Sequence, residues 1–151
     1  TRSVFFEGSQ TSPVVHSNVL SYITTATLGN ATDFGDVSVT IDSGPMGMGC
    51  SPTRGVMFHP SNGAGGGSDV IEYITIASTG NTTDFGDPTV SDLFASGMSN
   101  NTRGIFTGGE NSNVIEFVTI ATTGDAADFG DLQGNRSGGF GSCANGDGGH
   151  Q

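Results

Sequence analysis

Apolar residues in this chain gather in short runs, and polar turn residues separate the runs. The clearest runs are NVLSYITTAT from Asn18, VIEYITIAS from Val70 and NVIEFVTIATT from Asn113. β-Branched and aromatic residues dominate them, which is typical of strands joined by tight turns. No long apolar stripe recurs at helical spacing. The pattern therefore predicts an all-β protein with almost no helix.

Similar phrases recur along the chain at intervals near fifty residues. Arg2, Arg54 and Arg103 each follow a Thr and open a short apolar run, at steps of 52 and 49 residues. A period of this size indicates a propeller or a solenoid. We divide one domain, residues 1–151, into repeats 2–53, 54–102 and 103–151.

Each repeat contains four candidate strands. The run after the Arg is followed by a variable loop, a long apolar strand, an Asp-Phe-Gly-Asp segment and a stretch of small residues. The small-residue stretches are GPMGMGC from Gly44, LFASGMS from Leu93 and GGFGSC from Gly138. Four short strands per unit of this length form one blade of a β-propeller, so three four-stranded blades are predicted.

These residues resemble the kelch repeat, with an apolar run that ends in Gly-Gly (RGIFTGG from Arg103), a long strand, a short aromatic strand and a glycine-rich strand. The resemblance spans the chain, although the Gly-Gly pair occurs only in the third repeat and Trp is absent. It implies that the small-residue strand lies innermost, where backbones crowd around a channel. The phrase around Asp-Phe-Gly-Asp is also similar to repeats in virion proteins, such as tail fibres and appendages, of marine tailed phages.

The Asp-Phe-Gly-Asp segment is expected to form the outer strand of each blade. Its aromatic residues, Phe34, Phe85 and Phe129, are predicted to pack between neighbouring blades. The glycine that follows each Phe permits a bend, and the flanking Asp residues accept hydrogen bonds from the turn. The recurring residues Arg2, Arg54 and Arg103 are expected to pair with an Asp of the adjacent turn and to hold blade to blade.

Three blades are too few to close a ring, since propellers typically have four to eight. In the kelch phase the strands between Val4 and Thr40 lack an inner partner, and Gly138–Cys143 begins a blade whose other strands are absent. Either two copies close a six-bladed ring head to tail, each supplying the missing strand of the other, or the repeats continue in a longer chain. We therefore expect a homo-oligomer, or assembly with other virion proteins.

The charge balance excludes some partners. With 15 acidic residues, 4 Arg and no Lys, the net charge is −11, which disfavours nucleic acids and anionic membranes. No segment is long and apolar enough to span a bilayer. Repeated carboxylates could bind Ca²⁺, but their spacing fits no regular calcium loop, so turn capping is preferred and no cofactor is expected. The weak candidates are Asp33, Asp36, Asp84, Asp87, Asp128 and Asp131.

Other polar residues carry weaker signals. The histidines His16, His59 and His150 do not recur at matching positions and are expected to be solvated. Glu72 and Glu116 recur in the long strand, but Ser21 replaces them in the first repeat, which favours an edge or surface position. The two cysteines, Cys50 and Cys143, stand at matching points of two repeats and are expected to be small buried thiols rather than a disulfide.

No catalytic signature is found, so the chain is expected not to be an enzyme. The loops Gly8–Ser17, Ser61–Ser68 and Glu110–Ser112 vary while the strands stay alike, as in a scaffold that carries changing contacts. We expect a structural and adhesion module of a phage virion appendage, located in the virion or outside cells, whose loops bind a host-surface glycan. Alternatives are a fragment of an extracellular propeller-fold enzyme acting on glycans, or a cellular protein-interaction propeller.

Overall fold

The computed structural model describes residues 1–8, 10–11, 13–41, 47–59, 68–91, 96–107, 112–136 and 144. Within these ranges every regular element is a β-strand, which confirms the all-β prediction. Nor do they include a helical segment with the length and hydrophobicity that a membrane crossing requires. Several predicted features lie outside the described residues: loop residues 61–67 and 110–111, Gly138–Cys143 and His150.

The strands form three antiparallel sheets and one small hairpin. The first sheet contains β1 (Arg2–Phe6), β4 (Ser17–Thr24) and β5 (Thr32–Ile41) in that order. The second contains β6 (Gly47–Cys50), β7 (Arg54–Phe58), β8 (Ile71–Thr75) and β9 (Thr83–Gly86). The third contains β10 (Ser96–Ser99), β11 (Arg103–Thr107), β12 (Ser112–Thr119) and β13 (Ala127–Arg136). The hairpin pairs β2 (Gln10–Thr11) with β3 (Val14–Val15), in the connection between β1 and β4.

The strand order follows the predicted order of the repeat. The Asp-Phe-Gly-Asp strands β5, β9 and β13 form one edge of each sheet, and the small-residue strands β6 and β10 form the opposite edge. Each small-residue strand precedes its Arg in sequence, so a four-stranded sheet takes its first strand from the end of the preceding repeat. The first sheet is described with three strands, and among the described residues no strand pairs with the free edge of β1.

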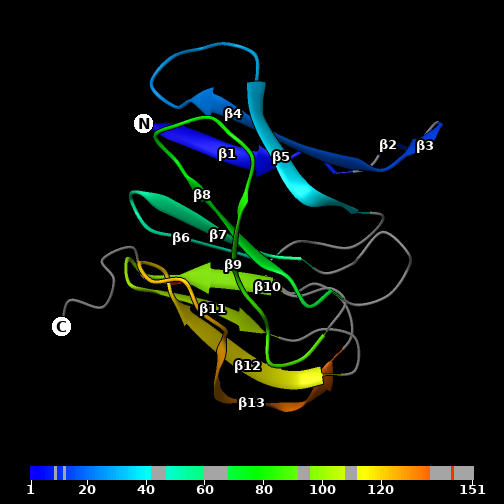
Figure 1. Ribbon diagram of the computed structural model, residues 1–151, viewed down its shortest axis with the longest axis vertical. Helices are drawn as coiled ribbons and strands as arrows, with labels where there is room; N and C mark the ends of the chain where they lie inside the picture. Colours follow the sequence, from blue (N-terminus) through cyan, green and yellow to red (C-terminus); the bar gives the residue numbers. More distant parts are fainter. Residues whose placement is uncertain are drawn as a thin grey trace.

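The three sheets are stacked along the long axis of the molecule (Figure 1). One buried cluster lies between the first and second sheets and contains Leu20, Phe34, Val37, Met57 and Ile74. A second lies between the second and third sheets and contains Val56, Phe58, Ile71, Phe85, Phe106, Val118 and Ile120. Apolar residues on the strands thus face the neighbouring sheet, and their burial is the main favourable term that holds the stack together.

The small-residue strands approach each other closely enough to require glycine. A Cβ built on Gly97 of β10 would lie 2.4 Å from the backbone nitrogen of Met48 in β6, and one on Gly49 would lie 3.0 Å from the Cα of Gly104. A side chain at Gly97 would overlap the β6 backbone. The composition of these stretches is therefore a direct consequence of backbone crowding at this edge of the stack.

Candidate assembly interface

The outer strand of the first sheet hydrogen-bonds to a turn of the second sheet. The Gly80 N–H donates to the carbonyl oxygen of Phe34 (2.7 Å), and the Thr82 N–H donates to that of Asp36 (2.9 Å). In return, the Asp36 N–H donates to Oδ1 of Asn81 (3.0 Å). The Asp-Phe-Gly-Asp edge therefore has its hydrogen-bonding groups paired by the next sheet.

The same bonds recur at the junction of the second and third sheets. The Gly124 N–H donates to the carbonyl oxygen of Phe85 (2.7 Å), and the Ala126 N–H donates to that of Asp87 (2.8 Å). The Asp87 N–H donates to Oδ1 of Asp125 (3.1 Å). Asn81 and Asp125 thus occupy equivalent positions and supply the same acceptor. The turn before the last strand of a sheet, between β8 and β9 or between β12 and β13, is therefore the binding partner of the Asp-Phe-Gly-Asp edge of the preceding sheet.

The glycines of the first two Asp-Phe-Gly-Asp segments lie directly against the next sheet. A Cβ on Gly35 would stand 2.3 Å from the carbonyl oxygen of Gly80, and one on Gly86 would stand 2.5 Å from that of Gly124. Gly35, Gly86 and Gly130 have φ angles of 146°, 149° and 144°, a conformation that disfavours any side chain. A Cβ on Gly130, however, would meet nothing within 4 Å. Among the described residues, the third glycine therefore has the conformation of the junction glycines but no neighbouring sheet.

The phenylalanine side chains of the three segments also differ between the first two sheets and the third. Phe34 and Phe85 are each 2% exposed between sheets, whereas Phe129 is 52% exposed. Phe34 and Phe85 thus lie between sheets, whereas Phe129 is left uncovered among the described residues, because no described sheet follows the third. Each ring makes an edge-to-face contact, 6.0 Å between centroids, with an aromatic residue of its own sheet: Tyr22, Tyr73 and Phe117 respectively.

The recurring arginines stack on these aromatic rings, and two of them also bond to the next sheet. Arg2, Arg54 and Arg103 stack on the rings of Tyr22, Tyr73 and Phe117 at 4.6, 4.2 and 4.7 Å. One guanidinium nitrogen of Arg2 donates to the carbonyl of Ala77 in the second sheet (3.0 Å), and one of Arg54 donates to that of Ile120 in the third (2.9 Å).

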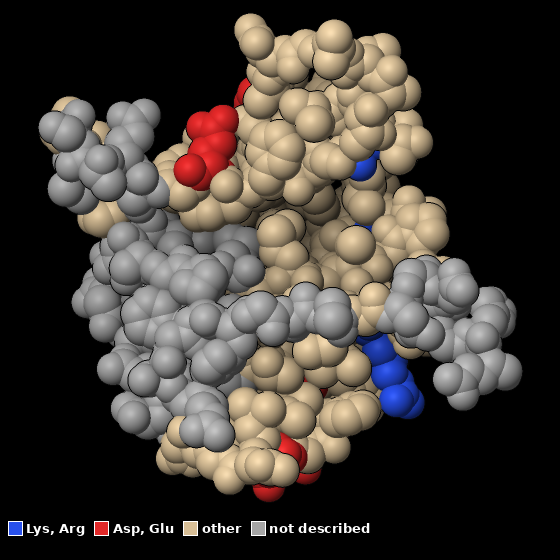
Figure 2. Space-filling model, turned by 180° about the vertical axis from the view of Figure 1, so that it is seen from behind, with Lys and Arg blue, Asp and Glu red and all other residues tan. Residues whose placement is uncertain are grey.

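These contacts correct the expected acceptor of the arginines. The sequence predicted an Asp of the adjacent turn, but Arg2 and Arg54 bind backbone carbonyls of that turn instead. A carbonyl is present whatever the turn sequence, so the contact does not depend on a conserved acid. Arg103 is exposed, whereas Arg2 and Arg54 are half-buried. Seen from behind, the arginine atoms lie in a column along one side of the molecule (Figure 2).

Two glutamates in the long strands reach back to the preceding sheet. Glu72 is buried, and its Oε2 accepts a hydrogen bond from the Ser38 N–H of the first sheet (3.2 Å). Glu116 is buried as well, and its Oε2 accepts one from the Thr89 N–H (2.6 Å). The expected surface position is therefore wrong for both. Sequence alone missed this role because the partner is a backbone N–H of another sheet.

His59 also differs from its predicted environment. It was expected to be solvated, but it is fully buried, with Nε2 2.7 Å from Oε2 of Glu72. Burial raises the pKa of Glu72, but the contacts with His59 and Ser38 outweigh that effect and lower the pKa from 4.5 to about 2. In the first sheet the equivalent pair is Glu7 and Ser21, whose side chains hydrogen-bond to each other. The first sheet thus also has a carboxylate in this pair, but it belongs to Glu7, which follows β1, rather than to the long strand β4.

The remaining candidates are the repeated Asp residues, His16 and Cys50, and in the described residues they do not come together in one site. Within the described ranges no cluster of His, Cys, Asp and Glu is arranged to hold a metal ion. The repeated carboxylates are spread over three sheets, and Oδ1 of Asp128 accepts a hydrogen bond from the Gly130 N–H, as expected for turn capping (3.2 Å). His16 is exposed. Cys50 is a free thiol and is exposed, so the expectation of a buried thiol is wrong at this position.

The two outer faces of the stack carry complementary halves of the junction. The third sheet presents Phe129, Gly130 and Asp131 as the second sheet presents Phe85, Gly86 and Asp87. The first sheet carries Gly29, Asn30 and Ala31 at the positions of Gly80, Asn81 and Thr82, and all three are exposed. Gly80 and Gly124, which donate across the junctions, have φ angles of 154° and 156°, and Gly29 has no φ of this kind.

Comparison with known proteins adds no family to this description. The sequence matches no protein-family model, and it matches no curated protein at a significant level. The repeated junction, with its two exposed halves, is therefore the feature on which a functional argument rests.

The junction glycines give a first prediction. Gly35→Ala and Gly86→Ala should each lower the free energy of unfolding by about 2–3 kcal/mol more than Gly130→Ala does. All three substitutions carry the same backbone strain, but only the first two force a Cβ into the next sheet. Urea unfolding at low protein concentration measures the difference. Equal losses in all three variants would show that the junction contact is not tight.

The buried glutamate gives a second prediction. Because the pKa of Glu72 is lower in the folded state than its ordinary value, its contribution to stability is present above pH 4.5 and is lost as the pH falls through 2. The loss should be about 3 kcal/mol, and Glu72→Gln should not show it. Urea unfolding between pH 5 and pH 2 tests this. Asp69→Asn, which alters an exposed carboxylate nearby, should keep the pH dependence of the unaltered protein.

Proposed function

We propose that the three sheets are successive blades of a kelch-like β-propeller. The support is the strand order, the glycine-rich strands β6 and β10 packed on one another at one edge, and the two junctions built from the same contacts. In a propeller the innermost strands crowd around the axis and the outermost strands lie at the rim. The close approach of Gly97 to Met48 fits the inner position of these strands.

The propeller closes by head-to-tail pairing of two copies. The single observation that carries this proposal is the complementarity of the exposed ends. The Phe129–Asp131 edge of one copy has the conformation of the occupied edges, and the segment 29–31 of a second copy has the sequence of the turns that occupy them. Such a contact joins two different surfaces and forms a ring when the rotation closes, here with six blades.

The assembled ring serves as a non-enzymatic structural and adhesion module of a phage virion appendage. Three observations support this function: the likeness of the repeat phrase to virion proteins, the variable loops on a constant scaffold, and the net charge of −11 without any Lys. Asn, Ser and Thr in the loops can hydrogen-bond sugar hydroxyls. A ring multiplies weak loop contacts, because further contacts of a bound ring are intramolecular.

Assembly gives a third prediction. At micromolar concentration the protein should have twice the mass of the 15.2 kDa chain in light scattering. Gly130→Ala should yield a folded species of single mass, because the added Cβ would meet the backbone of the second copy as it would at Gly35. Gly134→Ala on the same strand is the matched control. Its equivalents in the other repeats are Val39 and Val90, so a Cβ is tolerated there and the mass should not change.

A species of single mass for the unaltered chain over the whole concentration range would contradict the proposed pairing. A double mass that persists in Gly130→Ala would place the contact elsewhere.

Adhesion gives a fourth prediction. The ring should bind a subset of bacterial surface polysaccharides in an immobilised panel, without cleaving them. Replacing residues 61–67 by a Gly-Ser linker of equal length should remove binding, and Gly130→Ala should weaken it at least tenfold through loss of multivalency. Release of reducing sugar during the assay would instead favour an enzyme, and binding unchanged by the loop replacement would exclude this loop as the contact.

A further inference from the structure

The first sheet ends at β1, where the other two sheets carry one more strand. β6 pairs with β7 in a register that places Cys50 opposite Gly55 and Gly49 opposite Val56. β10 pairs with β11 in the same register, with Ser99 opposite Gly104. The equivalent positions on β1 are Ser3 and Val4. In the described residues, the only strand paired with β1 is β4, so the opposite edge is open to a further strand.

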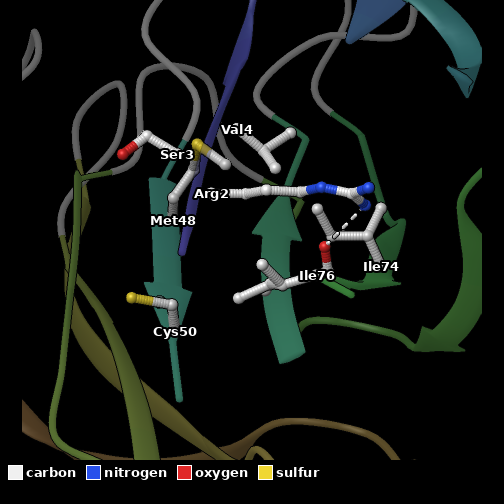
Figure 3. Close-up of a pocket in the computed structure, with 9 residues that line it drawn as sticks. Arg2, Ser3, Val4, Met48, Cys50, Ile74 and Ile76 are labelled. Atoms are coloured by element: carbon white, nitrogen blue, oxygen red, sulfur yellow. Dashed lines mark hydrogen bonds between the residues drawn. The ribbon is translucent and has the colours of Figure 1, made fainter. Parts of the chain in front are cut away.

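A cavity of about 290 Å³ lies beside this open edge. Its walls come from β1, β6, β7 and β8, and its lining includes Val4, Met48, Cys50, Ile74 and Ile76. Figure 3 shows Arg2 crossing the cavity toward Ile76, to whose carbonyl it donates at 3.4 Å. Apolar side chains therefore line a space at the same relative place where β6 packs against β10 and β11 in the next junction.

The neighbouring junction shows what kind of strand fits such a space. β6 lies there with Gly47 and Gly49 toward the third sheet. A Cβ on Gly47 would stand 3.1 Å from the ring of Phe106, and one on Gly49 would stand 3.4 Å from the Cβ of Ser99. The Ser99 hydroxyl also accepts a bond from the Cys50 N–H (2.8 Å) and donates to the Cys50 carbonyl (3.0 Å). The space takes a short strand of small residues.

One segment of this sequence matches that requirement by composition and by spacing. Cys143 follows Asp131 by 12 residues, as Ser99 follows Asp87 by 12 residues. With this alignment Gly141 takes the place of Gly97, whose Cβ would overlap the preceding strand. The stretch Gly138–Cys143 consists of small residues apart from Phe140. In the sequence it follows β13 as the β10 segment follows β9.

We propose that β1 and the adjoining cavity form an acceptor site for a donated strand, and that its occupant is Gly138–Cys143 of a second copy. This inference rests on the head-to-tail pairing proposed above and identifies the segment that completes it. The donated strand adds to β1 antiparallel, with Cys143 of the second copy opposite Ser3. The main-chain bonds to β1 supply affinity, and the small side chains fit against β6.

The register of the donated strand places one position directly against Cys50. Position 142 of the second copy is equivalent to Gly49, and Cys50 is equivalent to Ser99, so their Cβ atoms stand about as far apart as those of positions 49 and 99. The distance from a Cβ on Gly49 to that of Ser99 is 3.4 Å. Cβ atoms in disulfides are typically about 3.5–4.5 Å apart. A cysteine at position 142 should therefore cross-link to Cys50 of the neighbouring copy.

The test uses the full chain carrying Ser142→Cys together with Cys143→Ser. After treatment with diamide, a non-reducing gel should show a band of double mass, and peptide mass spectrometry should identify a link between Cys50 and position 142. Formation should be at least about tenfold faster than for Thr122→Cys with Cys143→Ser, an exposed control that can meet Cys50 only by collision. Adding Cys50→Ser should abolish the band.

Three results would overturn the inference. A double mass in light scattering without rapid cross-linking would keep the pairing and refute the donated strand. A cross-link within one chain would show that the occupant is not a second copy. A single mass together with no rapid cross-link would refute both the pairing and the donation.

Discussion

The fold depends on the close approach of one backbone to another at the outer edge of each sheet. The carbonyl of Phe34 or Phe85 accepts a bond of 2.7 Å from a glycine N–H of the next sheet. This approach leaves no room for a Cβ on the adjacent glycine, and it brings the Phe ring under the next sheet, where it is buried. Glycine, aromatic burial and the hydrogen bonds are therefore one constraint, which explains why Asp, Phe, Gly and Asp recur together.

Other contacts between the sheets come from strands other than the Asp-Phe-Gly-Asp strand and also stabilise the junction. Arg2 and Arg54 stack on an aromatic ring of their own sheet and bind carbonyls of the next one, while Glu72 and Glu116 accept bonds from the sheet before. Every described contact between sheets joins neighbours, so the stability of the stack is approximately a sum of sheet terms and junction terms. Each exposed half of a junction then lacks one junction term whose contacts are known from the internal junctions, and this is the basis of the proposed pairing.

The sequence was sufficient for features that the repeat period itself determines. The strand order, the edge position of Asp-Phe-Gly-Asp and the three strands described for the first sheet follow from the period, the turn residues and the small-residue stretches. Features that arise between sheets were missed. Burial of His59 and Glu72, and the carbonyl acceptors of Arg2 and Arg54, depend on backbone groups of another repeat. Backbone groups are nearly the same for every residue type, so the sequence does not show which of them will bind a side chain. The pattern of charges alone therefore suggested a surface glutamate and an Arg–Asp pair.

The phase of the strands within a sheet links the proposed pairing to the proposed strand donation. β6 and β10 each follow the outer strand of one sheet and become the first strand of the next, so every junction within the chain is crossed by a covalent connection. A junction made only by the Phe129 edge would lack that connection and would leave the cavity beside β1 unfilled. The proposed donated strand would supply both, because it would be joined covalently to the third sheet of its own copy and hydrogen-bonded to the first sheet of the other. In that assembly the junction between copies would differ from the internal ones only in which chain carries the connecting strand.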